Sequence, residues 1–174
     1  GREADSCKVL TAVMPFIGGS EAEARAKRDR HNALARPELG LVTLASQLNV
    51  DLSPFPLSAT LAEIARSPLI HPAAAEKLLM QGPDTTLEQL GRIFASSVRV
   101  PQLVGTGAQI ADQLAELFLG DGCDGFVISP AYLPGSFSEF VESVIPHLQR
   151  KGLFRRAYEG STLREHLGLA GLKD

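Results

Sequence analysis

The sequence predicts an α/β fold built on a parallel sheet, and three observations support this prediction. Residues 8–17 (KVLTAVMPFI) and 125–130 (GFVISP) are apolar on both faces, as strands buried inside a parallel sheet are. Segments with apolar residues at three- and four-residue spacing separate these two runs, as expected for amphipathic helices. Glycines stand where strand-like and helical segments meet. Strands that alternate with helices are typical of α/β proteins.

Composition excludes several classes of function. The chain has 174 residues, a hydrophobic fraction of 44%, a charged fraction of 21% and a net charge of −3, which are ordinary values for a globular domain. No basic stripe with interleaved aromatics is present, so we expect no nucleic-acid partner. No apolar run is long enough for a transmembrane helix and no signal peptide is evident, so we expect a cytoplasmic protein without a membrane partner.

The cysteines and histidines do not predict a metal site. Cys7 and Cys123 belong to no CxxC motif, and we expect them to be free thiols. The four histidines have no metal-ligand spacing among themselves or with the cysteines.

The first strand leads into a charged helix. Gly18 and Gly19 turn the chain, and Ser20 with Glu23 is a capping box that predicts a helix over 20–35. The charged residues of this helix are expected to form its solvated outer face.

Residues 36–97 have a different character, because prolines divide them into short segments and no strand-like run occurs. We interpret them as a helical insertion. The predicted helices cover 41–49, from its apolar spacing, 72–81, which opens on a proline, and 85–96, which opens on a Thr85/Glu88 capping box.

The remainder returns to the α/β pattern. Residues 98–104 are expected to be extended, with Pro101 arguing against a central strand. A helix over 108–119, the strand 125–130 and a helix opened by Ser136 and Glu139 follow. The apolar spacing of this last helix puts Phe137 and Val141 on its core face. Pro146 should kink or restart that last helix. The tail, 152–174, reads as a polar arm with scattered apolar side chains.

Four residues near the predicted strand ends are candidates for a pocket. Ser129 and Tyr132 leave the second strand at its carboxyl end, where parallel α/β proteins hold their sites. Phe16 is the corresponding residue of the first strand, although a core role is more typical than a ligand contact for a lone aromatic there. Thr106, in the turn Gly105–Gly107, could cradle a phosphate or simply cap the next helix. No nucleophile–base pairing is visible, so no catalytic residue is assigned.

Three segments resemble the carboxyl-terminal end of one flavin-dependent monooxygenase family. They are 103–112 (LVGTGAQIAD), 124–137 (DGFVISPAYLPGSF) and 138–169 (SEFVESVIPHLQRKGLFRRAYEGSTLREHLGL). This family includes nitrilotriacetate monooxygenase component A and dibenzothiophene sulfone monooxygenase, and belongs to the bacterial-luciferase-like superfamily. The chain departs from the family pattern at Gly107 and Ala108, where Pro and Glu are usual, and at Leu117, where Trp is frequent.

The resemblance implies that the chain is the carboxyl-terminal portion of a (β/α)8 TIM barrel. It would supply the last two strands and helices together with an insertion that could act as a lid. Implied parts are 1–35 (penultimate strand and following helix), 36–97 (insertion), 98–151 (last helix–strand–helix portion) and 152–174 (carboxyl-terminal arm). The abrupt beginning, without a start methionine, agrees with a piece of a longer protein.

The resemblance also implies a chemistry. Such an enzyme takes reduced FMN from a separate flavin reductase and uses O2 to oxidise a small organic substrate. The expected partners are therefore the reductase and the upstream half of the same barrel. Phe16, Thr106, Ser129 and Tyr132 would contribute to the cofactor or substrate pocket.

Two alternatives belong to other classes. One is a catalytically inactive fragment that acts as an association module through exposed sheet edges, for example as a homo-oligomer. The other is a small nucleotide-binding α/β protein that uses Gly105–Gly107.

Overall fold

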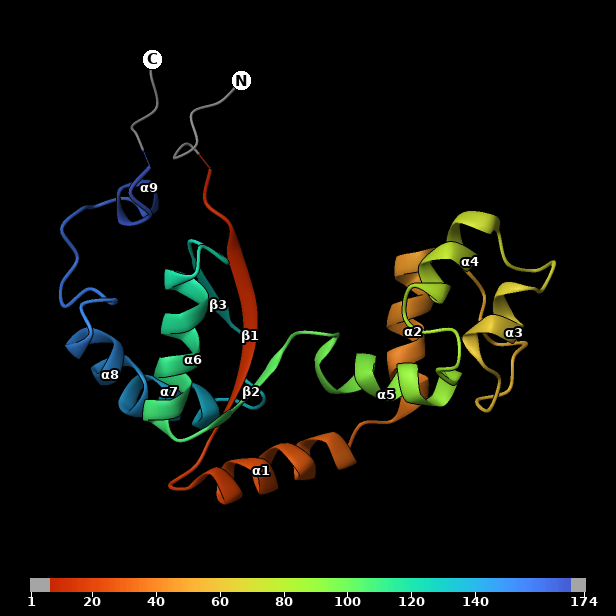
Figure 1. Ribbon diagram of the computed structural model, residues 1–174, viewed down its shortest axis with the longest axis horizontal. Helices are drawn as coiled ribbons and strands as arrows, with labels where there is room; N and C mark the ends of the chain where they lie inside the picture. The colour runs from red at the N-terminus through yellow and green to blue at the C-terminus, as the bar shows by residue number, and fades with distance from the viewer. Residues whose placement is uncertain (1–6, 170–174) are drawn as a thin grey trace, which may run out of the picture. The chain divides into compact units, whose positions relative to one another are not determined.

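The computed structural model describes residues 7–169, which form two compact units. The sheet unit contains the chain up to Arg28 and from Pro101 onward, and the helical unit spans Asp29–Val100. Figure 1 labels the elements, which follow in this order: β1 (Leu10–Ile17), α1 (Glu21–Ala33), α2 (Pro37–Leu48), α3 (Leu61–Ala65), α4 (Pro72–Leu79), α5 (Leu87–Ser97), β2 (Gln102–Gly105), α6 (Gly107–Leu119), β3 (Gly125–Ile128), α7 (Gly135–Ser143), α8 (Ile145–Arg150) and α9 (Leu163–His166).

The sheet unit contains a three-stranded parallel sheet in the order β2-β1-β3. The amino-terminal half of β1 pairs with β3, where Leu10 lies opposite Gly125, and its carboxyl-terminal half pairs with β2, where Ile17 lies opposite Gly105. The α/β class with a parallel sheet is therefore confirmed. The sheet has one strand more than the two expected, because the extended segment before Gly105 pairs with β1.

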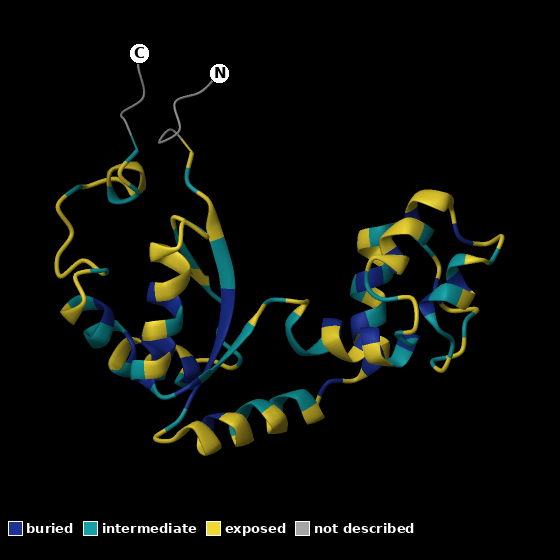
Figure 2. Ribbon diagram, viewed as in Figure 1, coloured by how far each residue is buried: buried dark blue, intermediate teal, exposed yellow. Residues whose placement is uncertain are grey.

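Helices α6, α7 and α8 lie on one face of this sheet (Figure 1). Their apolar sides and the strands enclose a core, in which Val13 and Ile17 of β1 meet Ile110, Leu114 and Phe140. Figure 2 shows the buried residues gathered along β1 and the inner sides of these helices. Burial of such a face is the main favourable contribution to the stability of the unit.

The other face of the sheet carries the alternate residues of the strands. Met14 and Phe16 point away from the core that contains Val13 and Ile17, because successive side chains of a strand alternate. Val127, opposite Ala12 in the register, is 50% exposed. Part of this apolar face is therefore open to solvent.

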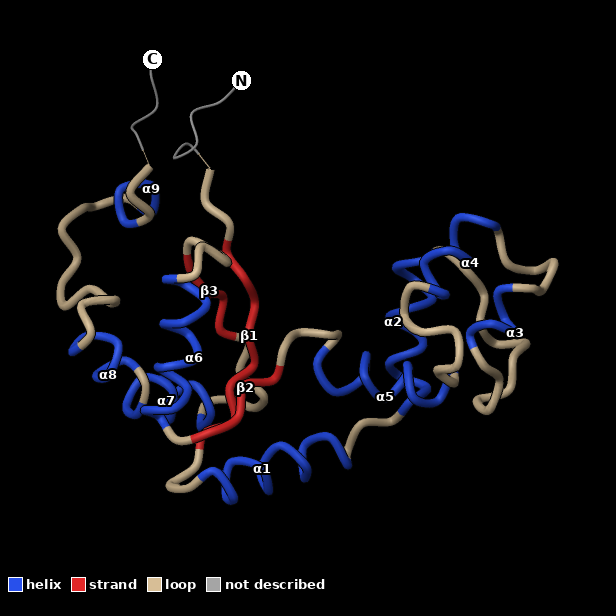
Figure 3. The backbone as a smooth tube through the Cα atoms, viewed as in Figure 1, coloured by secondary structure: helices blue, strands red, loops and turns tan. Residues whose placement is uncertain are grey.

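The helical unit has a core of its own. Helices α2 and α5 pack closely, and the shorter α3 and α4 complete a cluster around Leu61, Ile64, Leu78 and Leu87, which are each fully buried. Loops join these short helices (Figure 3).

Several local predictions were wrong. Helix α2 begins at Pro37 rather than 41, because the proline suits its first turn. The capping box of α5 is Thr86/Gln89 and not Thr85/Glu88. Helix α3, with its Thr60/Glu63 box, was not predicted.

The last helical segment was predicted in part. The chain does break before Pro146, since α7 ends at Ser143 and α8 begins at Ile145. Ser136 does not cap α7, because its hydroxyl is buried and bonded to the carbonyl of Tyr132. Phe137 and Val141, expected in the core, are 47% and 46% exposed.

Candidate functional site

The carboxyl ends of the three strands form the candidate site. All strands are parallel, so these ends lie at one edge of the sheet, where α/β proteins bind ligands. Phe16 is the penultimate residue of β1, Thr106 directly follows β2, and Ser129 directly follows β3. Phe16 and Thr106 lie together at the end of the β1–β2 pair, whereas Ser129 lies four residues lower along β1, because Ile128 is opposite Val13 and Gly105 is opposite Ile17.

Phe16 forms part of the sheet wall. It is 3% exposed and lies beside Val104 of β2 in the register. Its ring belongs to the face opposite α6 and α7. Phe16 can thus supply an apolar surface but no polar group.

Thr106 is the N-cap of α6. Its hydroxyl accepts a hydrogen bond from the Gln109 backbone N–H at 3.4 Å, and its own N–H donates to Gln109 Oε1 at 2.8 Å. The next residue, Gly107, packs so closely that an added Cβ would lie 2.2 Å from the Ser143 carbonyl oxygen. The capping interpretation of this turn therefore fits better than a phosphate cradle, because the Thr106 donor is already used.

Ser129 is the first residue after β3. Its backbone N–H donates to the Val13 carbonyl at 2.9 Å. Within residues 7–169 its hydroxyl makes no hydrogen bond. A ligand atom at this edge would find that hydroxyl available.

Tyr132 stands in the loop between β3 and α7 and is 49% exposed. Ser136 fastens this loop: its hydroxyl donates to the Tyr132 carbonyl at 2.6 Å and accepts from the Tyr132 N–H at 3.2 Å. The phenolic hydroxyl donates to Glu139 Oε1 at 3.4 Å. Its position is therefore set by α7.

Lys27 and Glu139 complete the edge, and the sequence alone did not indicate them. Lys27 Nζ donates to Glu139 Oε1 and to the Ile17 carbonyl, each at 2.8 Å. The hydrogen bond to Glu139 is the largest cause of the raised pKa of Lys27. The sequence suggested only a solvated helix face for Lys27 and a cap for Glu139.

A small cavity of about 190 Å³ opens beside this pair. Its lining consists of Ile17, Gly18, Gly19, Lys27, Gly107, Glu139 and Ser143. Because Glu139 compensates the charge of Lys27, the cavity does not present an unpaired cation. The edge as a whole offers an apolar wall, two hydroxyls and a neutralised ion pair.

This arrangement contains no obvious nucleophile. Cys7 and Cys123 lie toward the amino ends of the strands, away from the candidate edge. No group of three or more potential metal ligands comes together anywhere in residues 7–169. No helix in that range is long and apolar enough to cross a membrane.

Comparisons with known proteins identify relatives along nearly the whole chain. The chain is 44% identical, over 97% of its length, to dibenzothiophene-sulfone monooxygenase of Rhodococcus erythropolis. It is 38% identical over its full length to nitrilotriacetate monooxygenase component A of Aminobacter aminovorans. The chain is related to these monooxygenases. The resemblance found in the sequence is thereby confirmed.

The monooxygenase relatives are much longer than this chain, which spans 38% and 39% of their lengths. A crystal structure of riboflavin lyase with modified FMN and riboflavin is similar in fold, with a TM-score of 0.75 and 28% identity. That match covers 96% of this chain and 36% of the lyase. No family model matches the chain.

Proposed function

We propose that this chain is the carboxyl-terminal part of an FMN-dependent two-component monooxygenase, which takes reduced flavin from a separate reductase and uses O2 to oxidise a small organic substrate. The observation that carries the proposal is the 44% identity to a monooxygenase over 97% of the chain. The chain covers 38% of that relative, so the rest of the fold would come from upstream sequence.

The sheet unit supports a place in a (β/α)8 barrel. Strands β1 and β3 are parallel neighbours, and α6, which leads from β2 into β3, lies on the same side as α7. This is the arrangement of two consecutive barrel strands with their outer helices. The face with Phe16 and half-exposed Val127 would then belong to the barrel interior, which side chains of the remaining strands would fill.

In this proposal β1 is the seventh barrel strand and β3 the eighth. Strand β2 pairs only with the last four residues of β1, from Met14 to Ile17, and would be an addition contributed by the inserted sequence. The lid role of 36–97 stays a prediction.

The described residues fit a flavin ring better than a phosphate. Phe16 offers an apolar wall at the carboxyl edge, the Ser129 hydroxyl can donate or accept a hydrogen bond, and the Tyr132 hydroxyl, which donates to Glu139, can still accept one. Thr106 is occupied as a cap and Lys27 by Glu139, so phosphate contacts would come from the upstream strands. The bound cofactor supplies the redox chemistry.

The role of these residues is to bind, orient and exclude water. An apolar wall at Phe16 lowers the local dielectric and keeps solvent from the reacting atoms. Ser136 and Glu139 hold the Tyr132 loop, so the phenolic hydroxyl has a defined direction. No proton transfer by a side chain of this chain is required for that role.

Anaerobic titration with reduced FMN tests the proposal. We expect binding when the chain is co-expressed with the unmatched amino-terminal part of the Rhodococcus erythropolis relative, and little binding by the chain alone. Phe16→Ala should weaken FMN affinity of the complex by about tenfold through lost apolar contact. Tyr132→Phe, which removes the phenolic hydroxyl, should also weaken FMN affinity. Tyr158→Phe is its matched control, because Tyr158 lies outside the proposed pocket. Equal FMN affinity of wild type and the Phe16 and Tyr132 variants would contradict the assignment.

One observation favours a second candidate, an association module. The partly open apolar face around Val127 could pair two copies of the chain. Stable self-association without flavin affinity, abolished by Val127→Glu, would support this reading instead.

A further inference from the structure

A second cavity lies at the opposite edge of the sheet, beneath the carboxyl-terminal arm, defined here as 152–169. It has a volume of about 420 Å³, within the range of about 300–1,000 Å³ typical of small-molecule sites. Lys8 and Leu10 of the β1 end and Asp124 and Gly125 of the β3 end mark it as the amino edge of the strands. It is therefore separate from the edge that carries Ser129 and Tyr132.

The walls of this cavity are mainly apolar. They come from α6, β3, α7, α8 and the arm, and include Leu114, Phe118, Phe126, Ile128, Phe140 and Leu148. This apolar part of the lining favours a hydrocarbon group over water, because it offers no hydrogen bonds, and polar groups come from Lys8, Asp124, Arg155 and His166.

Arg155 of the arm provides a cation at the rim. Its guanidinium lies 5.0 Å from the Tyr158 ring centroid and 5.9 Å from that of Phe154. The Gln149 side-chain amide donates a hydrogen bond to the Arg155 backbone carbonyl at 3.0 Å. Among the described residues, no carboxylate forms an ion pair with Arg155. The cation is positioned but not neutralised.

Three carboxylates line the two cavities, those of Asp124, Glu159 and Glu165, and two of them are already engaged. Asp124 pairs with Lys8 and accepts the Val9 N–H at 2.7 Å. Glu165 accepts the N–H groups of Ser161 and Thr162 at 2.8 and 3.0 Å. Neither has to move when an external anion approaches Arg155.

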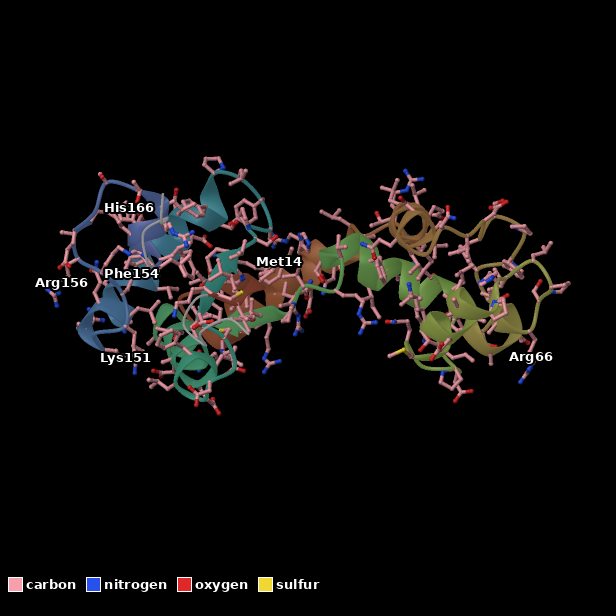
Figure 4. The ribbon with its side chains drawn as sticks, turned by 90° about the horizontal axis from the view of Figure 1, so that it is seen from above. Met14, Arg66, Lys151, Phe154, Arg156 and His166 are labelled. Atoms are coloured by element: carbon pink, nitrogen blue, oxygen red, sulfur yellow. The ribbon has the colours of Figure 1, made fainter. Side chains whose placement is uncertain are left out.

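A second, more polar cavity of about 590 Å³ adjoins the first one, since Phe154, Arg155 and His166 line both. His166 is held in place by two contacts. Its ring lies against that of Tyr158, with centroids 4.4 Å apart and the planes tilted by 41°, and its Nε2 lies 2.8 Å from the Gly160 carbonyl oxygen. Figure 4 labels Phe154 and His166 in this region and Arg156 at its outer end. An apolar space thus continues into a polar one at Arg155.

We propose that this pair of cavities binds a single-chain aliphatic carboxylate, with its hydrocarbon chain in the apolar cavity and its carboxylate at the Arg155 guanidinium. The planar guanidinium can donate two parallel hydrogen bonds to a carboxylate. A neutral hydrocarbon would leave Arg155 unused, and a small anion without a chain would leave the apolar walls unfilled.

Calorimetric titration of the intact chain with decanoate, below micelle-forming concentrations, tests this site. Decanol, which lacks the charge, and acetate, which lacks the chain, are the ligand controls. We expect decanoate to bind, and both controls to bind at least tenfold more weakly. Arg155→Gln should weaken decanoate binding by about tenfold, since the charge-assisted hydrogen bonds to the carboxylate are lost. Arg66→Gln, at an exposed position of the helical unit, is the matched control and should bind as wild type does.

A second variant tests the cavity itself. Leu167→Trp places a larger side chain in the lining of the apolar cavity and should abolish binding while circular dichroism stays that of the wild type. The proposal is overturned if decanoate does not bind, if decanol binds equally well, or if either Arg155→Gln or folded Leu167→Trp retains wild-type affinity.

Discussion

The close packing of α2 on α5 allows one prediction to be worked out in magnitude. Gly40 faces Gly91, and a Cβ added at Gly40 would lie 1.8 Å from the Gly91 carbonyl oxygen and 2.6 Å from the Ala95 nitrogen. Both obstacles are backbone atoms, so rotation of a side chain cannot relieve them. Gly40→Ala therefore requires the helices to separate by more than an ångström, which loosens the contacts of Leu44 and Leu90 in the core.

Two opposing contributions decide the size of the effect. Overpacking a core costs about 1–3 kcal/mol, and the upper end applies because the clash is with backbone. Replacing glycine by alanine inside a helix returns about 1 kcal/mol. The expected net loss in free energy of unfolding is about 2 kcal/mol.

Urea unfolding of the intact chain, followed by circular dichroism, measures this loss, and hydrogen exchange assigns it to α2 and α5 amides. Ser46→Ala, at an exposed position of α2, is the matched control and should leave stability within about 0.5 kcal/mol of wild type. A Gly40→Ala variant as stable as wild type would refute the reasoning, because helix propensity would then outweigh the steric contact.

Three further predictions concern caps and charges of the sheet unit. Thr106→Ala should lower the free energy of unfolding by about 1 kcal/mol through loss of the α6 cap, and Thr106→Ser should restore it; an unchanged urea midpoint for Thr106→Ala would exclude the capping role. The raised pKa of Lys27 means that its pairing with Glu139 stabilises the fold fully below pH 10.5 and is lost as pH rises through the folded-state pKa. Wild type should be more stable than Glu139→Gln by less than about 1 kcal/mol, because the pair is partly exposed. In urea unfolding this difference in stability should become smaller above pH 10.5, and a difference that grows there would mean that the pair does not stabilise the fold through the charge of Lys27. The backbone N–H of Val9 is the largest cause of the lowered pKa of Asp124, so the stability lost in Asp124→Asn should be greatest above pH 3.8 and vanish as pH falls through the folded-state pKa; unfolding curves that stay separated at lower pH would argue against it.

The elements that sequence predicted well are those whose signal is local. Strand β1 was recognisable because residues 8–17 are apolar on both faces, and the break before Pro146 follows from the missing N–H of proline. The short helix α3 was missed because a helix of five residues shows no periodicity, although its Thr60/Glu63 box was readable. At α5 the sequence rule selected Thr85/Glu88, one position before the box that forms.

Tertiary packing decided the cases that local rules could not. The α5 box falls on Thr86 and Gln89, which places Leu87 fully inside the core of the helical unit. Apolar periodicity put Phe137 in a core, yet it is 47% exposed, because periodicity does not say whether a covering element is present.

The candidate site divides in the same way. Phe16, Thr106 and Ser129 all stand near the carboxyl ends of parallel strands, which the sequence order predicts, but the stagger that leaves Ile128 opposite Val13 and Gly105 opposite Ile17 was not predictable. The ion pair of Lys27 with Glu139 joins residues 112 positions apart. Such a contact depends on how α1 and α7 meet at the strand ends, and no spacing rule within the sequence expresses it.

The most direct test of the central claim is native mass spectrometry of the chain with FMN, after co-expression with the unmatched amino-terminal part of the Rhodococcus erythropolis relative. The account predicts a complex of the 18.6 kDa chain with that partner in equal numbers, carrying FMN that neither part holds alone. A chain that stays alone or pairs only with itself, with no flavin bound in any species, would contradict the claim that it completes a flavin-dependent monooxygenase.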